Sequence, residues 1–168
     1  MGWKRMRIVI REYTERDLPE MMEIWNEIVE AGIAFPQMEH LTRETAIALF
    51  EEQSFTAAAV NQDSGEVLGL YILHPNNIGR CGHISNASYG VKSHARGLKV
   101  GEKLIRHSIE KGKELGFKLL QFNAVVKTNY SALHLYEKLG FVKLGVIPGG
   151  FLMKDETFED IVLFYRIL

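Results

Sequence analysis

Residues 125–141, VVKTNYSALHLYEKLGF, join the end of an apolar strand to a short amphipathic helix. Apolar side chains share one face of that helix, namely Ala132, Leu135, Tyr136 and Leu139. Asn129 or Thr128 is placed to cap its N-terminus, because a short polar side chain there can accept from an unpaired backbone N–H. Gly140 is expected to end the helix, since glycine adopts the left-handed conformation needed there without strain.

A second glycine-containing stretch, SHARGLKVGEKLI at residues 93–105, lies one strand and one helix earlier. It follows an apolar strand and opens a helix, an arrangement in which unpaired N–H groups and the helix dipole attract anions. It lacks the Gly-Lys-Ser/Thr ending of a nucleoside triphosphatase loop, so ATP hydrolysis is disfavoured. It also departs from the dinucleotide pattern G-x-G-x-x-G, and no acidic residue follows for a ribose. Taken alone, such a turn also fits a purely structural helix start.

The remaining periodicity predicts one α/β domain over residues 1–168. Strands are expected at residues 7–11, 56–60, 67–73, 83–91, 118–126, 141–147 and 158–168. Helices are expected at residues 17–31, 42–50 and 100–115 and after Asn129. A strand–helix–strand crossover is local and right-handed, so the strands around the 100–115 helix should be parallel neighbours. The fold class is therefore mixed α/β, with a mostly antiparallel sheet of about seven strands and about four flanking helices.

Composition limits the class of protein. Hydrophobic residues make up 46% and charged residues 24%, which is ordinary for a globular domain. The formal net charge of -1 gives no global attraction to nucleic acid or to an acidic membrane. Cys81 is the only cysteine, which excludes an intramolecular disulfide and a cysteine-rich zinc site. The sequence has neither a signal-peptide core nor an apolar run of roughly 18 residues, so a cytoplasmic location is expected.

Together, the two glycine-containing stretches resemble the signatures of the GNAT superfamily of acyl-CoA-dependent N-acyltransferases. The first resembles Arg/Gln-x-x-Gly-x-Gly/Ala, with Arg96 and Gly101 in place and Lys99 instead of the first glycine. The second is similar to Asn-x-x-Ala-x-x-x-Tyr-x-x-x-Gly-Phe, here formed by Asn129, Ala132, Tyr136, Gly140 and Phe141. The order of elements agrees over essentially the whole chain. The resemblance implies a single GNAT domain that uses acetyl-CoA as cosubstrate and needs no metal.

The resemblance also implies where the cofactor binds. Backbone N–H groups of the 96–101 loop would hold the diphosphate of CoA, and the parallel strands beside it would splay apart. N–H groups near the end of the 83–91 strand would hold the pantetheine arm and the acyl oxygen, where fixed donors stabilise an oxyanion. The expected cofactor-binding residues are Tyr89, Gly90, Val91, Arg96, Gly97, Leu98, Lys99, Val100, Gly101, Asn129 and Tyr136.

Lys99 stands where the family pattern has a glycine. Because the loop would act through its backbone, a side chain directed to solvent need not block the phosphate. A lysine there could also add a cation near the 3′-phosphate end of CoA, at some cost to close backbone approach. We interpret Lys99 as a tolerated substitution.

Tyr136 matches the family tyrosine whose hydroxyl lies near the sulfur of CoA and acts as a general acid. Its position on the apolar helix face also fits a simple core aromatic, and without the motif that interpretation would be favoured. Asn129 likewise has two interpretations, a helix cap or a hydrogen bond to the cofactor, and it could serve both.

Asn86 and Asn123 fall inside two strands that should be central in the sheet. A buried amide without a partner costs about 1–3 kcal/mol, so each asparagine needs one. These segments resemble a subgroup that includes the fungal azetidine-2-carboxylate acetyltransferases, with His-x-x-Asn-Ala and Phe-Asn-x-Val-x-x-Thr-Asn. That resemblance places both asparagines in the acceptor site, where they would orient the acceptor nitrogen. The alternative is an amide pair that satisfies itself across the sheet.

The general base is left open. His83 is one candidate, because the unperturbed imidazole of histidine suits proton uptake, but a lone histidine at a strand edge is more often only solvated. Glu27 and Glu30 lie near the acceptor region on a helix whose exposed glutamates usually do no more than solvate it. Ordered water could relay the proton instead. Acidic residues near the C-terminus could attract a cationic substrate or simply form surface, namely Asp155, Glu156, Glu159 and Asp160.

The sequence thus predicts an N-acetyltransferase that acts on the amine of a small molecule, such as an amino or imino acid, by direct attack in a ternary complex. A covalent acyl-cysteine is disfavoured, because Cys81 has no matched His–Asp arrangement. A homodimer is expected, with neither nucleic acid nor membrane as partner. The alternatives are acetylation of a protein or peptide N-terminus and a non-catalytic module that binds acetyl-CoA.

Overall fold

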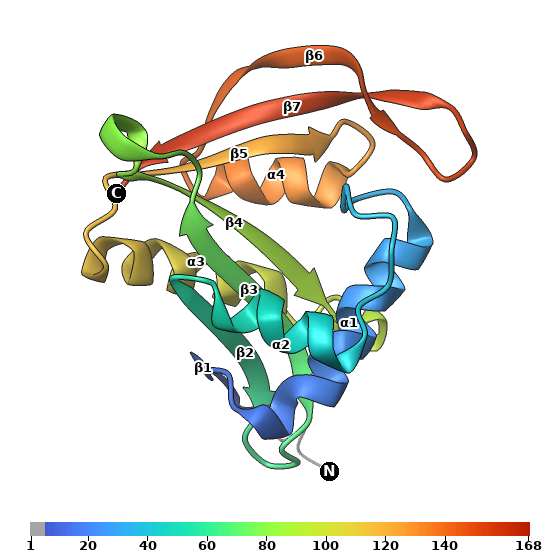
Figure 1. The fold of residues 1–168 in the computed structure, drawn as a ribbon, viewed down its shortest axis with the longest axis vertical. Helices are drawn as coiled ribbons and strands as arrows, with labels where there is room; N and C mark the ends of the chain where they lie inside the picture. Colours follow the sequence, from blue (N-terminus) through green and yellow to red (C-terminus); the bar gives the residue numbers. More distant parts are fainter. Residues whose placement is uncertain (1–5) are drawn as a thin grey trace.

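A computed structural model describes residues 6–168 as a seven-stranded sheet with helices on both faces (Figure 1). The strands are β1 (Ile8–Glu12), β2 (Phe55–Asn61), β3 (Val67–Pro75), β4 (Ile84–Val91), β5 (Leu119–Val126), β6 (Val142–Leu152) and β7 (Phe158–Ile167). The helices are α1 (Leu18–Ala31), α2 (Arg43–Glu51), α3 (Val100–Glu114) and α4 (Tyr130–Lys138). The strand order is β1-β2-β3-β4-β5-β7-β6, with β4 and β5 parallel and the other neighbours antiparallel. The predicted fold class is confirmed.

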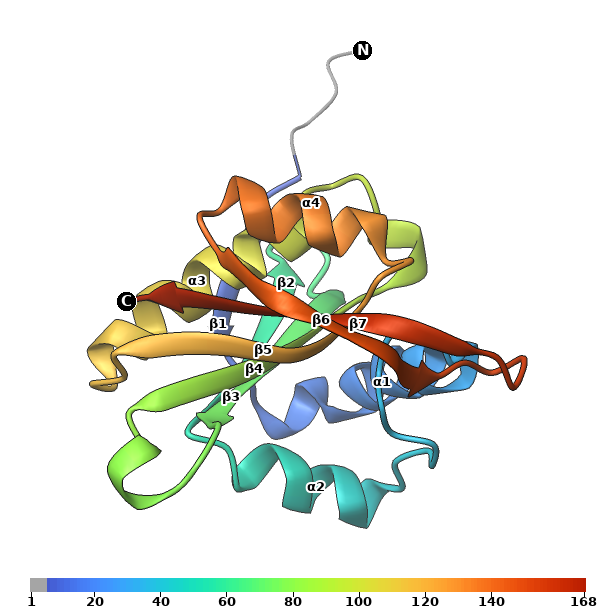
Figure 2. The ribbon, with the colours of Figure 1, turned by 90° about the horizontal axis from the view of Figure 1, so that it is seen from above.

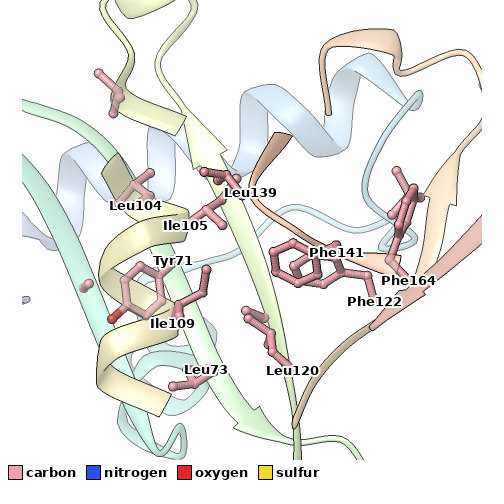
Figure 3. Packing of buried hydrophobic residues seen from close by; sticks show 14 of the residues in the cluster. Tyr71, Leu73, Leu104, Ile105, Ile109, Leu120, Phe122, Leu139, Phe141 and Phe164 are labelled. Atoms are coloured by element: carbon pink, nitrogen blue, oxygen red, sulfur yellow. The ribbon is translucent and has the colours of Figure 1, made fainter. Parts of the chain in front are cut away.

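Helices α1 and α2 cover one face of the sheet, and α3 and α4 cover the other (Figure 2). Successive strand residues point to opposite faces, so β3 sends Leu70 and Ile72 toward α1 and α2 and sends Tyr71 and Leu73 toward α3. Figure 3 shows the face that α3 covers, where Leu104, Ile105 and Ile109 of the helix belong to one cluster with the aromatic side chains Tyr71, Phe122 and Phe164 of the sheet. β3 is buried on both faces over most of its length, and it lies beside β4 in the middle of the sheet.

Gly69 of β3 allows α3 to approach the sheet closely. A Cβ at this position would lie 2.8 Å from the carbonyl oxygen of Gly90 and 3.0 Å from Cγ1 of Val100. Val100 is the first residue of α3, and it is buried together with Leu104. The absence of a side chain at Gly69 therefore allows the N-terminus of α3, where the glycine-containing loop ends, to lie close to the sheet.

The helix ends follow the sequence predictions. The side chain of Asn129 accepts from the N–H of Ala132 at 3.4 Å and caps α4. Gly116 and Gly140 have φ of 88° and 84° and terminate α3 and α4. A Cβ at Gly140 would also lie 2.5 Å from Nη1 of Arg166, so that position excludes a side chain on two grounds.

The start of α1 differs from a simple capped helix. Residues 15–17 form a 3₁₀ turn, and the buried carboxylate of Asp17 accepts from Arg11 at 2.6 Å and from the N–H of Thr14 at 2.7 Å. Burial opposes ionisation of Asp17, but the hydrogen bonds from Arg11 and Thr14 outweigh it, and the pKa lies below its ordinary value. Asp17 thus ties β1 to α1 instead of capping the helix.

The prediction that β6 ends at Ile147 is wrong. The strand continues through Pro148, Gly149 and Gly150 to Leu152, and a register shift against β7 between Ile147 and Phe151 absorbs the irregular segment. A Cβ at Gly150 would lie 2.5 Å from Cγ1 of Ile161, so glycine lets the bulged strand pass β7 closely instead of ending it.

Within residues 6–168, no helix is long and apolar enough to cross a membrane. Residues 1–5, at the start of the N-terminal segment in which no signal-peptide core is expected, lie outside the described residues.

Candidate active site

The strands β4 and β5 pair over only two residues before they diverge. Ile84 pairs with Leu119 and Ser85 with Leu120, and no further pairs follow in the described chain. Figure 1 shows the two strands separating toward the N-terminus of α4. The gap leaves backbone groups of both strands without strand partners.

Two N–H groups of β4 face this gap. The N–H of Lys92 donates to the carbonyl of Leu68 in β3 at 2.8 Å, which fixes the hydrogen-bonding phase of the β3–β4 ladder. Because N–H directions alternate along a strand, those of Tyr89 and Val91 point away from β3 and toward the gap. Gly90, between them, is buried against α1, where a Cβ would lie 2.9 Å from Cδ1 of Ile28.

A cavity of about 570 Å³ opens at the gap on the face that α1 and α2 cover. Asn86 and Ser88 of β4 and Asn123 of β5 line it from the sheet. The connection between α1 and α2 and the end of α2 contribute further walls, including Gln37 and Gln53. We call this space the acceptor cavity.

A second cavity of about 380 Å³ lies beside the glycine-containing loop and the start of α4. Arg96 and Val91 line it on one side, and Thr128 and Asn129 on the other. We call this space the cofactor cavity. Tyr89 and Asn129 line both cavities, so the two spaces meet where β4 and β5 separate.

The loop itself is built to present backbone donors. Within residues 6–168, no acceptor is found for several N–H groups at the start of α3, those of Lys99, Val100, Gly101 and Glu102. Gly97 has φ of 86°, which turns the chain into the helix. Free N–H groups at the positive end of a helix dipole fit a diphosphate, and this geometry suits CoA.

Lys99 adopts the conformation that a glycine would favour, with φ of 60° and ψ of 25°. Its side chain is exposed, as the prediction of a solvent-directed lysine requires. The loop thus keeps the left-handed shape that suits a glycine. This backbone costs an L-residue such as Lys99 about 1–2 kcal/mol. A lysine therefore replaces the glycine of the motif, while the backbone keeps the left-handed conformation typical of glycine.

Lys99→Gly is therefore expected to raise the free energy of unfolding by up to about 1 kcal/mol, after the chain entropy of glycine is subtracted. Gly97→Ala is the matched control, because Gly97 has positive φ and open space around a Cβ, and it should lose about 1–2 kcal/mol. Urea denaturation measures both changes. A loss of more than 1 kcal/mol on Lys99→Gly would contradict the assigned backbone strain.

Tyr136 both packs in the core and faces the acceptor cavity. Its ring centroid lies 4.4 Å from that of Phe122, 5.5 Å from Phe141 and 5.7 Å from Phe164. Burial raises the pKa of the phenol well above its ordinary value, and no hydrogen bond to the hydroxyl is found in the described part of the chain. The core packing expected from the sequence is confirmed, and the role of Tyr136 as a general acid stays a prediction.

The hydroxyl of Tyr89, unlike that of Tyr136, has a hydrogen-bond partner within the described residues. Its hydroxyl lies 2.7 Å from Oγ of Ser108, which in turn donates to the carbonyl of Ile105. Burial raises the pKa of Tyr89 well above its ordinary value, and the nearby Tyr136 raises it further. The ring meets Phe122 edge-on at 5.8 Å and forms a fixed wall between the two cavities.

The two strand asparagines have protein partners, and they are not paired with each other. Asn86 donates through Nδ2 to the carbonyl of Gln121 at 2.8 Å, where the parallel pairing stops. Asn123 donates to Oδ1 of Asn76 at 2.6 Å and accepts from Nε2 of Gln121 at 3.0 Å. These contacts hold both side chains at the acceptor cavity, with Oδ1 of Asn86 free of hydrogen bonds within the described chain.

The structure does not bring the other proton-transfer candidates into the acceptor cavity. His83 is exposed ahead of β4, and Glu30 is paired with His40 and Lys154 outside it. Glu27 lines the cofactor cavity instead. The acidic residues near the C-terminus, Asp155, Glu156, Glu159 and Asp160, line neither cavity. Asp155 accepts from Thr157, and Asp160 contacts Lys127.

Sequence patterns gave no signal for several polar residues of the acceptor cavity, namely Gln37, Glu52, Gln53 and His74. They lie in the α1–α2 connection, after α2 and near the end of β3, and their convergence depends on how α2 packs on the sheet. Among residues 6–168, no group of three or more His, Cys, Asp or Glu side chains is arranged to hold a metal ion.

Comparisons with known proteins agree with this geometry. A profile described as the acetyltransferase (GNAT) family matches residues 11–141. The chain is similar to N-acetyltransferase aca1 of Schizosaccharomyces pombe, with 32% identity over 99 residues that cover 58% of this chain and 47% of the relative. The chain spans less than half the length of the curated relatives it matches.

Solved structures show the same fold. A GCN5-related N-acetyltransferase from Kribbella flavida has a TM-score of 0.88 and 34% identity, covering 96% of this chain and 98% of that one. The acetyltransferase yncA from Salmonella typhimurium, solved with acetyl-CoA, has a TM-score of 0.88 at 18% identity, covering 96% and 94%. At that identity, the second likeness concerns the fold alone.

Proposed function

The chain belongs to the acetyltransferase (GNAT) family, and from this premise we propose that it moves an acetyl group from acetyl-CoA to the amine of a small molecule. The transfer occurs by direct attack in a ternary complex within one GNAT domain. The observation that carries the proposal is the meeting of the two cavities at Tyr89 and Asn129. One cavity adjoins a loop with free N–H donors, and the other has room for a second reactant.

Residues of the loop and of β4 hold the cosubstrate in this proposal. N–H groups from Lys99 to Glu102 bind the diphosphate, and Arg96 lines the path from there toward the gap. The N–H groups of Tyr89 and Val91 hold the pantetheine arm and the acyl oxygen. Donors fixed at that oxygen stabilise the negative charge that develops as the amine attacks.

Tyr136 supplies the proton that the departing sulfur needs. Tyr136 lines the acceptor cavity, and a phenol is protonated near neutral pH, so it has a proton to give. Asn86 and Asn123 orient the acceptor nitrogen from the floor of the cavity. Their likeness to the strand asparagines of azetidine-2-carboxylate acetyltransferases supports an amino or imino acid, or a similar amine, as acceptor.

A contact between the β6–β7 connection and the end of α1 favours a small acceptor over a protein N-terminus. The N–H of Lys154 donates to the carbonyl of Gly32 at 3.0 Å, and its Nζ contacts the carbonyl and the carboxylate of Glu30. This contact holds the α1–α2 connection, whose Phe35 and Gln37 line the acceptor cavity. An extended peptide would need an open groove between the hairpin and that connection.

We further propose a cytoplasmic enzyme that acts as a homodimer and engages neither nucleic acid nor membrane. The edge strand β6 supports self-association, because it exposes apolar side chains such as Leu144 and Val146 along a free strand edge. Sedimentation of the purified protein tests the dimer.

The activity is tested by acetyl-CoA-dependent thiol release across amino acids, imino acids, polyamines and short peptides. We expect turnover with one or more small amines. Turnover with peptides alone would support N-terminal acetylation instead. Binding of acetyl-CoA without thiol release above the hydrolysis rate would support a non-catalytic binding module.

Asn123→Ala should raise the KM for the acceptor about tenfold and leave CoA affinity unchanged, since one hydrogen bond of about 1–1.5 kcal/mol is lost. Asn77→Ala is the control, because Asn77 bonds only to the N–H of its neighbour Ile78 and lies outside the cavity. Steady-state kinetics with a fixed acetyl-CoA concentration measure the difference. Equal KM values for the two variants would remove Asn123 from the acceptor site.

A further inference from the structure

We propose that His74 is the general base that receives the proton of the acceptor amine, a role that rests on the acetyl transfer proposed above. His74 is the next-to-last residue of β3 and lies directly opposite Asn86 in the β3–β4 register. It lines the acceptor cavity and is half-buried.

The position of His74 on the sheet puts it on the acceptor side. Ile72, two residues earlier, is buried against α1 and α2, and strand alternation places His74 on the same face. Side chains directly opposite in antiparallel strands have Cβ atoms about 4.5–5.5 Å apart. His74 is thus next to Asn86, whose Oδ1 is free within the described chain.

The backbone fixes which ring nitrogen of His74 is basic. Nδ1 lies 2.9 Å from the carbonyl oxygen of Pro75, and a carbonyl can only accept a hydrogen bond. In the neutral ring, Nδ1 therefore carries the proton and Nε2 carries the lone pair. Nε2 has no hydrogen-bond partner within residues 6–168. The strand end thus presents a basic nitrogen to the cavity in a fixed tautomer.

The other titratable groups of the acceptor cavity are less suited to this role. They are Glu52 after α2, Tyr89 of β4 and Tyr136 of α4, and no lysine or arginine lines the cavity in the described chain. The two phenols are protonated at neutral pH even at their ordinary pKa, and burial raises both pKa values further, so neither is a base. A carboxylate in water is a weaker base than an imidazole, which titrates closest to neutral pH.

The acceptor ammonium loses one proton to Nε2 of His74, through a water that Oδ1 of Asn86 can hold. The neutral nitrogen then bonds to the acyl carbon, the carbon–sulfur bond breaks, and Tyr136 gives its proton to the sulfur. The second proton of the nitrogen restores the phenol, and His74 releases its proton to solvent.

The test compares His74→Gln with His83→Gln, a matched control at an exposed histidine outside the cavity. In the wild type and in His83→Gln, we expect kcat to fall tenfold per pH unit on the acid side. In His74→Gln, this limb should disappear and kcat at neutral pH should drop about 100-fold, with the Kd of CoA unchanged. Added imidazole should restore part of the rate to His74→Ala.

The outcomes separate the two proposals. An acid limb that survives in His74→Gln, with kcat within threefold of wild type, would overturn the role of His74 while acetyl transfer stands. Absence of turnover by the wild type with every amine would overturn both. If His74→Gln melts early or loses CoA affinity, His74→Asn is measured instead, because its amide can keep the hydrogen bond to Pro75 without a basic nitrogen.

Discussion

Tyr136→Phe is expected to lower kcat about 100-fold while the Kd of CoA stays within about twofold. The substitution removes only the hydroxyl, for which no hydrogen-bond partner is found in the described chain, from a side chain that lines the acceptor cavity. The ring contacts with Phe122, Phe141 and Phe164 are kept, so the fold should not change. The loss should therefore fall on the step in which the sulfur leaves.

Thiol release at saturating acetyl-CoA measures kcat, and calorimetry measures CoA affinity. Tyr165→Phe is the control, because Tyr165 lies in β7 and lines neither cavity. An unchanged kcat in Tyr136→Phe would remove this tyrosine from the acid role. A parallel loss of CoA affinity would assign the hydroxyl to binding instead of proton transfer.

Phe122→Ala is expected to reduce the free energy of unfolding by about 3–5 kcal/mol. Phe122 is 4% exposed and lies at the centre of the aromatic cluster, with Phe141 stacked at 4.8 Å and Tyr136 at 4.4 Å (Figure 3). Its removal leaves a cavity beneath the gap between β4 and β5. Tyr136 then loses the ring that fixes its orientation, so kcat should also fall.

Urea denaturation measures this loss, with Phe122→Leu as the conservative control. Leucine keeps much of the volume, and its cost should stay below about 1.5 kcal/mol. The close packing of this cluster would be contradicted if both variants lost the same free energy of unfolding, or if Phe122→Ala lost less than about 1.5 kcal/mol.

The order and type of the elements could be read from the sequence because these signals are local. The apolar face of α4, the cap at Asn129 and the glycines after α3 and α4 each depend on neighbours within about one helical turn. The parallel pairing of β4 and β5 also followed, since a strand–helix–strand unit has few alternatives.

The features that escaped prediction depend on contacts between distant segments. The continuation of β6 through Gly150 depends on Ile161 of β7, which leaves no room for a side chain there. The partners of Asn123 are Gln121 of the same strand and Asn76 from the β3–β4 connection. His74 is marked only by strand alternation, and its hydrogen bond to Pro75 emerges from the folded backbone.

The left-handed backbone of Lys99 is a further feature that the sequence alone could not reveal. The sequence reveals a lysine at a glycine position, but it does not reveal that the chain keeps the left-handed geometry. That geometry leaves the N–H groups of the loop free, and the proposed binding of the cosubstrate depends on them.

A crystal structure with bound CoA tests this dependence most directly. We expect diphosphate oxygens within about 2.7–3.2 Å of N–H groups between Gly97 and Glu102, and the sulfur at the gap beside Tyr136. A diphosphate bound elsewhere, with this loop empty, would contradict the proposed acetyl transfer at its starting point.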